Sequence, residues 1–293
     1  MKRVLITGAS GLLGSKLVKA LSGGYEVIPT HSTHPTHPDS LRIDIVDREE
    51  VARVLSAVRP ELVVHAAAEA DVDKCETYRE LAWSVNAEGT RNIAEACGKI
   101  GAKLVYISTD YVFDGEKGLY SEESLARPVN YYGLTKLKGE EFVRELCEIF
   151  LIVRTSVLYG WHPRRLNFAT WVIDSLRNGK TISVVDDHYN SPTLADNLAE
   201  IIRRMMEMDA TGVYHTAGSE RIGRYGFAVK IAEIFELDKL LLAPVKMEDL
   251  KIWVAKRPRD SSLCIDKIRK EMGIEPLKLD EALRRMRDSI SEV

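Results

Sequence analysis

The sequence is poor in cysteine, lacks long apolar runs and carries little net charge. Cys75, Cys97, Cys147 and Cys264 lie far apart and form no CxxC or Cys/His spacing, so neither a zinc site nor a disulfide framework is indicated. Lys and Arg number 41 against 44 Asp and Glu, and a formal charge of -3 leaves no overall positive field to hold nucleic acid or an anionic membrane. No stretch is apolar for long enough to act as a signal sequence or to cross a bilayer. We therefore expect a cytoplasmic protein with neither nucleic-acid nor membrane partners.

The sequence does contain enough apolar residues, 45% of 293, for one large or two modest domains. In its first half, short apolar segments alternate with amphipathic helical patterns. The predicted strands are residues 3–7, 25–28, 62–65, 103–108 and 150–154, and the predicted helices between them are residues 12–21, 51–58, 87–97 and 133–147. Because parallel strands need crossover connections, this alternation predicts a doubly wound parallel α/β sheet of the Rossmann type, with helices on both faces.

After residue 156 the alternation becomes irregular. Residues 159–165 and 186–192 are rich in Gly, Pro, His and Asn and are interpreted as loops, whereas 167–177, 194–206, 225–235 and 279–287 are predicted helices and 213–216 a strand. We predict a nucleotide-binding domain over residues 1–155, extended by 192–212 and 225–236. A smaller substrate-binding portion over 156–293 is interleaved with it. A homodimer stays open, because periodicity does not distinguish an interface from a core.

A glycine-rich segment directly follows the first predicted strand. Residues 8–14 read GASGLLG, which fits GxxGxxG between a strand and a helix. Glycines there permit a tight turn and close approach of a pyrophosphate to the N-terminus of the helix. The alternative is a plain strand-to-helix turn. The candidate cofactor-binding residues of this segment are Gly8, Ser10, Gly11, Leu12, Leu13 and Gly14.

The end of the second predicted strand bears on the choice of cofactor. It has Thr30, His31 and Ser32 where an acidic residue would bind both hydroxyls of the adenine ribose. The missing carboxylate allows NADP(H) as well as NAD(H), although no arginine marks the position for a phosphate. Asp44 and Ile45 are placed to meet the adenine, and the alternative for Asp44 is a turn or helix-cap carboxylate. The histidines of residues 31–38 are interpreted as part of a polar loop, and no metal is predicted.

A phenol and an ammonium stand one helical turn apart at the start of a predicted helix. Tyr132 and Lys136 therefore share a face, and the ammonium is expected to bring the pKa of the phenol down toward neutrality. YxxxK alone also describes a solvated helix face. Thr109 follows Ser108 at the carboxyl end of a predicted strand, where a hydroxyl can bind a substrate carbonyl oxygen. Together, Thr109, Tyr132 and Lys136 are the predicted catalytic residues for chemistry on a carbonyl.

Motifs along the whole chain resemble those of a known family. They are TGASGLLG at the start, HAAA at 65–68, STDYVFDG at 108–115, NYYGLTKLKGE at 130–140, RTSVLYG at 154–160 and RPRDSSL at 257–263. The sequence resembles the extended short-chain dehydrogenase/reductase superfamily and, within it, the dTDP-4-dehydrorhamnose reductase family. That resemblance implies hydride transfer between a nicotinamide and the C4 ketone of a nucleotide-linked 6-deoxysugar, as in the step from dTDP-4-dehydrorhamnose to dTDP-L-rhamnose.

The resemblance also implies roles for single residues. Tyr132 would donate the proton, Lys136 would lower its pKa and hold the nicotinamide ribose, and Thr109 would bind the carbonyl. Ala66, Ala67, Ala68 and Asn86 would lie at the cofactor, while Asn86 on its own is as well explained as a helix cap. The candidate substrate-binding residues are Val72, Thr109, Tyr111, Val157, Asn167 and Arg257.

Three positions depart from the family or stay open. Val157 stands where bacterial members often have a tryptophan, which predicts a reshaped sugar pocket. Lys16 stands where some members have a glutamate in a magnesium-bridged dimer, so that metal is not expected. Arg257, with its basic neighbours in the chain, is either a diphosphate clamp or ordinary solvated surface.

Two other functions compete with the reductase. RTSVLYG and RPRDSSL also resemble the NADP-binding regulatory β subunit of methionine adenosyltransferase, although the intact Thr109, Tyr132 and Lys136 favour turnover. A nucleotide-sugar epimerase or dehydratase uses the same Tyr/Lys pair with tightly held NAD. Dehydratases usually have further acidic residues after the threonine, and here Asp110 is followed by Tyr111 and then by apolar residues.

Overall fold

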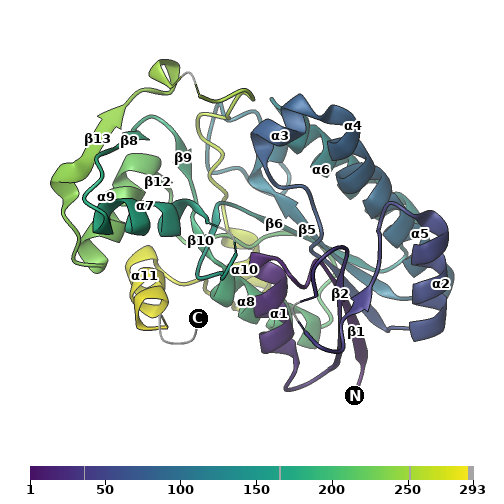
Figure 1. The fold of residues 1–293 in the computed structure, drawn as a ribbon. Coiled ribbons are helices and arrows are strands. Elements are labelled where there is room, and N and C mark those ends of the chain that lie inside the picture. The colour runs from purple at the N-terminus through teal and green to yellow at the C-terminus, as the bar shows by residue number, and fades with distance from the viewer. Residues whose placement is uncertain (36, 165, 251, 290–293) are drawn as a thin grey trace.

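A seven-stranded parallel sheet forms the larger part of the computed structural model, which describes residues 1–35, 37–164, 166–250 and 252–289 (Figure 1). Thr36 and Arg165, which belong to two of the predicted loops, lie outside these ranges. The strand order is β11-β6-β5-β4-β1-β2-β3. The strands are β1 (Arg3–Thr7), β2 (Glu26–His31), β3 (Leu41–Arg42), β4 (Leu62–His65), β5 (Lys103–Thr109), β6 (Phe150–Thr155) and β11 (Gly212–His215). The chain moves outward from β1 through β2 and β3 and then returns to β4, which confirms the predicted doubly wound sheet.

Helices cover both faces of this sheet. On one face, α1 (Leu12–Leu21) packs against α8 (Ala195–Glu207), and both contribute to one apolar core. On the other face, α5 (Gly89–Ile100) lies between α2 (Arg48–Val58) and α6 (Tyr131–Leu146) over a second core. Two covered faces explain why the central strands β4 and β5 are buried along their whole length.

The parallel register brings the carboxyl ends of the strands to one edge. Thr7 of β1 pairs with His65 of β4, and Thr109 of β5 pairs with Thr155 of β6. The Thr7 hydroxyl and His65 Nδ1 are 2.6 Å apart, and burial lowers the pKa of His65 to about 3. A neutral, hydrogen-bonded imidazole therefore lies beneath this edge of the sheet.

A smaller unit lies beside the sheet, at the left in Figure 1. Its core is built from α7 (Phe168–Arg177), α9 (Arg224–Ile234), α11 (Leu279–Asp288) and the paired strands β8 (Ile182–Val185) and β13 (Leu242–Val245). Residues 225–236, which the sequence assigns to the nucleotide-binding domain, place Phe227, Ile231 and Phe235 in this core.

Several short elements complete the fold. The segments predicted as loops at 159–165 and 186–192 contain residues of β7 (Leu158–Tyr159) and β9 (Tyr189–Asn190), which pair with β10 (Thr193–Leu194) and β12 (Ile222–Gly223). The remaining elements are α3 (Val72–Thr77), α4 (Arg79–Ala82), the π-helical η1 (Trp83–Glu88), the 3-10 turns η2 (Asp110–Val112), η3 (Lys239–Leu241) and η4 (Met247–Asp249), and α10 (Asp266–Met272). Within the described ranges, no helix has both the length and the apolarity to span a membrane.

Candidate active site

A cavity of about 750 Å³ runs along the carboxyl edge of the sheet and reaches the smaller unit. Most of the residues proposed from the sequence lie on its wall. They are Gly8, Ser10, Gly11, Leu12, Leu13, Gly14, Thr30, His31, Ser32, Asp44, Ile45, Ala66, Ala67, Ala68, Val72, Thr109, Tyr111, Tyr132, Lys136, Val157 and Asn167. Asn86 and Arg257 are not on this wall.

The glycine turn is shaped to bring backbone close to a ligand. Gly8 has φ +69°, and a Cβ there would lie 2.7 Å from the backbone nitrogen of Ala67. A Cβ on Gly14 would lie 2.1 Å from the Gly8 carbonyl oxygen. Gly11 caps α1 without a side-chain hydrogen bond. The turn thus offers a narrow backbone cradle at a helix N-terminus, which suits a pyrophosphate.

The wall continues past the end of β2 toward the place expected for the adenosine. Thr30 is fully buried and donates to the Ile6 carbonyl, whereas His31 Nδ1 lies 2.8 Å from the Ser40 hydroxyl. Asp44 lines the cavity and also accepts from the Val46 backbone N–H at 3.0 Å. Asp44 therefore both lines the cavity and accepts a hydrogen bond within a turn, the two roles that the sequence left open.

The three proposed catalytic side chains line the same cavity. Tyr132 lies in the first turn of α6, and its hydroxyl hydrogen-bonds with Thr109. Lys136 lies one turn further on, 3% exposed, with Nζ 4.2 Å from the centre of the Tyr106 ring. Thr109 in turn donates to Asp110 at 3.1 Å. A phenol, an alcohol and an ammonium thereby face one space at the carboxyl end of β5.

The protonation of this group differs from the expectation that Lys136 lowers the pKa of Tyr132. Burial raises the pKa of Tyr132 above its ordinary value, and the hydrogen bond with Thr109 only partly opposes this effect. Burial also lowers the pKa of Lys136 to about 7. Desolvation is the largest influence on the pKa of each group, so the phenol keeps its proton at neutral pH and is ready to act as an acid.

A buried ion pair holds α6 against the sheet. Arg154 of β6 donates to Glu140 of α6 at 2.8 and 2.7 Å, and Ser108 of β5 donates to the same carboxylate at 2.7 Å. Glu140 is one turn beyond Lys136 and two beyond Tyr132, so all three lie on the inner face of the helix. At the other end of α6, Asn130 accepts from the Gly133 N–H at 2.8 Å and fixes the first turn.

Asn86 and Arg257 have contacts other than those expected. Asn86 is fully buried, accepts from the Glu69 N–H at 2.8 Å and donates to the Glu69 carbonyl at 3.0 Å. It therefore fixes the segment after the alanines from behind the cavity wall. Arg257 donates to both carboxylate oxygens of Asp73, at 3.0 and 2.7 Å, so its guanidinium is committed to the protein itself.

Sequence reasoning missed three charged residues on the cavity wall, Asp71, Asp110 and Arg224. Asp110 accepts hydrogen bonds from Thr109, Ser156 and Ser261. Because it follows Thr109 directly in the sequence, it could have been predicted as a site residue. Arg224 is the first residue of α9 and lies far along the chain from every motif. No sequence pattern pointed to it.

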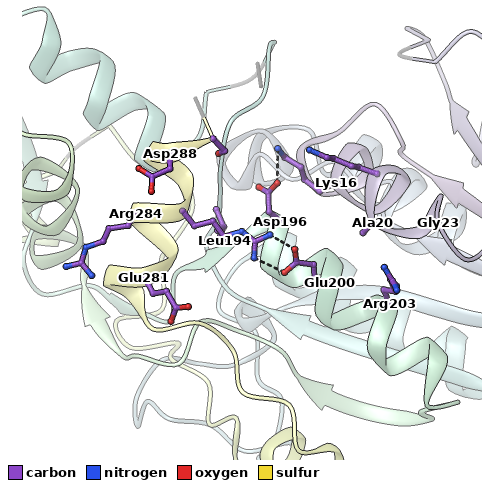
Figure 2. Close-up of a pocket in the computed structure, with 13 residues that line it drawn as sticks. Lys16, Ala20, Gly23, Leu194, Asp196, Glu200, Arg203, Glu281, Arg284 and Asp288 are labelled. Carbon is purple, nitrogen blue, oxygen red and sulfur yellow. Dashed lines mark hydrogen bonds and ion pairs between the residues drawn. The ribbon is translucent and has the colours of Figure 1, made fainter. Parts of the chain in front are cut away.

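A second hollow, of about 780 Å³, lies between α1, α8 and α11 and is lined mainly by charged side chains (Figure 2). Lys16 pairs with Asp196 at 3.1 Å, and Arg285 pairs with Glu200. Among the described residues, no group of three or more His, Cys, Asp or Glu side chains could hold a metal ion. Lys16 instead neutralises the acidic residue that faces it.

A glycine cradle and a Thr–Tyr–Lys group on a doubly wound sheet are the features of the short-chain dehydrogenase/reductase class. Residues 1–292 match the family model described as RmlD substrate binding domain. The chain therefore belongs to this family, which is that of the dTDP-4-dehydrorhamnose reductases, and is an NAD(P)-dependent oxidoreductase.

Three similar proteins illustrate the range of the family. The chain is 34% identical to a probable low-salt glycan biosynthesis reductase, Agl14, of Haloferax volcanii over 98% of each chain. It is 35% identical to the solved dTDP-4-dehydrorhamnose reductase of Bacillus anthracis in complex with NADP, with a TM-score of 0.91 and coverage of 99% and 100%. It is also 33% identical to methionine adenosyltransferase 2 subunit beta of Bos taurus, over 89% of this chain and 80% of the relative.

The glycine cradle gives the first test. We predict that Gly14→Ala weakens NADP⁺ binding about tenfold or more, because the new methyl must displace the Gly8 carbonyl that shapes the turn. Gly23→Ala is the matched control, since a Cβ there meets no atom within 4 Å. Titration of each variant by intrinsic fluorescence measures the effect. Equal affinities of the two variants would place the cofactor elsewhere.

Proposed function

We propose that this protein reduces the 4-keto group of a dTDP-linked 6-deoxysugar, namely dTDP-4-dehydrorhamnose, to give dTDP-L-rhamnose. The observation that carries this proposal is the meeting of Thr109, Tyr132 and Lys136 in one cavity with the glycine cradle. Membership of the dTDP-4-dehydrorhamnose reductase family supports the sugar-nucleotide substrate. The 750 Å³ cavity extends from the cradle to the smaller unit and leaves room for a second ligand beside the cofactor.

The residues divide the chemistry between them. The bound nicotinamide cofactor supplies the hydride. When substrate is bound, the Thr109 hydroxyl turns from Asp110 and donates its hydrogen bond to the ketone oxygen. Tyr132 donates its proton to the same oxygen as negative charge develops there. The raised pKa of Tyr132 keeps this proton in place at neutral pH. The Lys136 ammonium favours the tyrosinate that remains. As the resemblance to the family implies, Lys136 would also hold the nicotinamide ribose.

The structure bears on both competing functions. The Asp110 carboxylate accepts hydrogen bonds from Thr109, Ser156 and Ser261. The residues that follow Tyr111 are the fully buried, apolar Val112 and Phe113. The segment after Thr109 therefore does not supply an acidic pair for the elimination of water. This arrangement disfavours a dehydratase. The regulatory alternative is favoured by the similarity to methionine adenosyltransferase 2 subunit beta. Wild-type protein that binds NADP⁺ tightly, captures a partner enzyme and fails to oxidise NADPH with the sugar nucleotide would establish that alternative.

Tyr132→Phe tests the proton donor. We expect the reduction of dTDP-4-dehydrorhamnose to slow by about 10²- to 10⁴-fold, the usual contribution of a general acid, while NADP⁺ affinity is kept. Tyr131→Phe is the matched control, because Tyr131 is the neighbouring phenol and does not line the cavity. NADPH oxidation followed by absorbance measures both variants. Turnover of Tyr132→Phe close to wild type would show that another group supplies the proton.

The lowered pKa of Lys136 leads us to predict that the reduction rate depends on pH. A pKa of about 7 means that the ammonium is present below that pH and is lost as the pH rises through it. We therefore expect kcat/KM for the reduction to fall between pH 6 and 9. Lys136→Met should give a lower and flatter profile, since the raised pKa of Tyr132 lies above this window. A wild-type profile without any fall would rule out a catalytic role for the ammonium.

A further inference from the structure

The cavity wall carries one cation that the proposed chemistry does not use. Among the described residues of that wall, Lys136 and Arg224 are the only Lys or Arg side chains. Lys136 stands beside Tyr132 at the catalytic centre. Arg224 enters from the smaller unit, as the first residue of α9 directly after β12. Its backbone N–H donates to the His188 carbonyl at 2.8 Å, which fixes the point from which the side chain extends.

Arg224 has hydrogen-bonding capacity left over. Its Nη1 atom is buried and has no hydrogen-bond partner, although the guanidinium hydrogen-bonds with Tyr111. The carboxylate of Asp110 faces the same charge, but that carboxylate already accepts from three hydroxyls. A buried donor without an acceptor costs free energy, and a guanidinium presents five donors. The wall therefore holds a cationic group whose Nη1 atom lacks an acceptor.

The guanidinium is also held in a fixed orientation. Its Cζ atom lies over the Phe168 ring, 4.6 Å from the ring centre. Phe168 packs in turn against Phe227 and Trp171, with ring centres 5.4 and 5.8 Å away. A planar group stacked on a packed aromatic cluster loses little further conformational freedom when it binds a ligand. The paired N–H groups of a guanidinium also match the spacing of two phosphate oxygens.

The position of Arg224 relative to the catalytic residues indicates which part of a ligand it meets. Arg224 hydrogen-bonds with Tyr111, and the Tyr111 and Tyr132 rings are 6.0 Å apart. The guanidinium is therefore one side chain away from the proton donor, on the side of the smaller unit. In a sugar nucleotide whose ketone lies at Tyr132, the anionic group attached to the sugar is the diphosphate.

We propose that Arg224 binds the diphosphate of the substrate and thereby selects a nucleotide-linked sugar over a free sugar. This inference rests on the proposed function, since it takes the sugar nucleotide as the ligand of the cavity. Arg224 then fills the role that the sequence suggested for Arg257, whose guanidinium is engaged by Asp73. Paired, charge-assisted hydrogen bonds from a guanidinium to a diphosphate would add affinity and fix the position of the sugar.

The test compares dTDP with thymidine, which lacks only the diphosphate, and with UDP, which carries the diphosphate on another nucleoside. Isothermal titration of the NADP⁺-loaded protein would measure the affinities for dTDP, UDP and thymidine. For Arg224→Met we expect the affinities for dTDP and UDP to fall about 10- to 100-fold, with thymidine and NADP⁺ changed less than about twofold. Arg224→Lys, which keeps the charge without the paired N–H groups, should lie between wild type and Arg224→Met.

The matched control is Arg91→Met, because Arg91 is also stacked on a phenylalanine, Phe142, but does not line the cavity. It should bind all ligands as wild type does. The inference is overturned by unchanged dTDP affinity in Arg224→Met, by an equal loss for thymidine, or by wild type that binds neither diphosphate. Because no turnover is needed, loss of dTDP binding in Arg224→Met supports the inference even if the wild type reduces no dTDP-4-dehydrorhamnose.

Discussion

The buried ion pair between Glu140 and Arg154 is the constraint on which the site depends. Both side chains are at most 3% exposed, and Ser108 adds a third hydrogen bond to the carboxylate. The pair joins α6 to β5 and β6, the two strands whose ends supply Thr109 and Thr155. A charge buried in this way is stable only with its partner in place, so α6 has one position on the sheet. That position sets where Tyr132 and Lys136 enter the cavity.

The two units of the fold supply different parts of the site. The sheet provides the glycine cradle and the catalytic group, both at the carboxyl edge where open α/β sheets bind their ligands. The smaller unit contributes Asn167, Phe168 and Arg224 to the opposite wall. Asp110, which follows β5, accepts from Ser261, 151 positions further along the chain. The cavity therefore requires both units to be folded together.

Features that depend on residues close together in the chain could be predicted from the sequence. Apolar runs between turn residues located β1 and β4 to the residue, and GxxGxxG and YxxxK marked segments that the structure places on one cavity wall. Patterns could not show contacts made across the chain. Arg257 pairs with Asp73, 184 positions away, and α9 packs in the smaller unit because α7 and α11 supply its apolar surroundings. The pKa of Tyr132 likewise depends on burial, which the spacing of two residues does not reveal.

A double-mutant cycle on Glu140 and Arg154 tests most directly whether this pair holds the site together. Glu140→Gln and Arg154→Met would be made singly and together, and the free energy of unfolding measured by chemical denaturation. Each single change should cost about 3–5 kcal/mol, because Glu140→Gln leaves the buried Arg154 without a carboxylate, and Arg154→Met leaves the buried Glu140 with only the partly exposed Arg144 as a cationic partner. The double variant should cost little more than either single one, and strictly additive costs would show that the two side chains do not depend on each other.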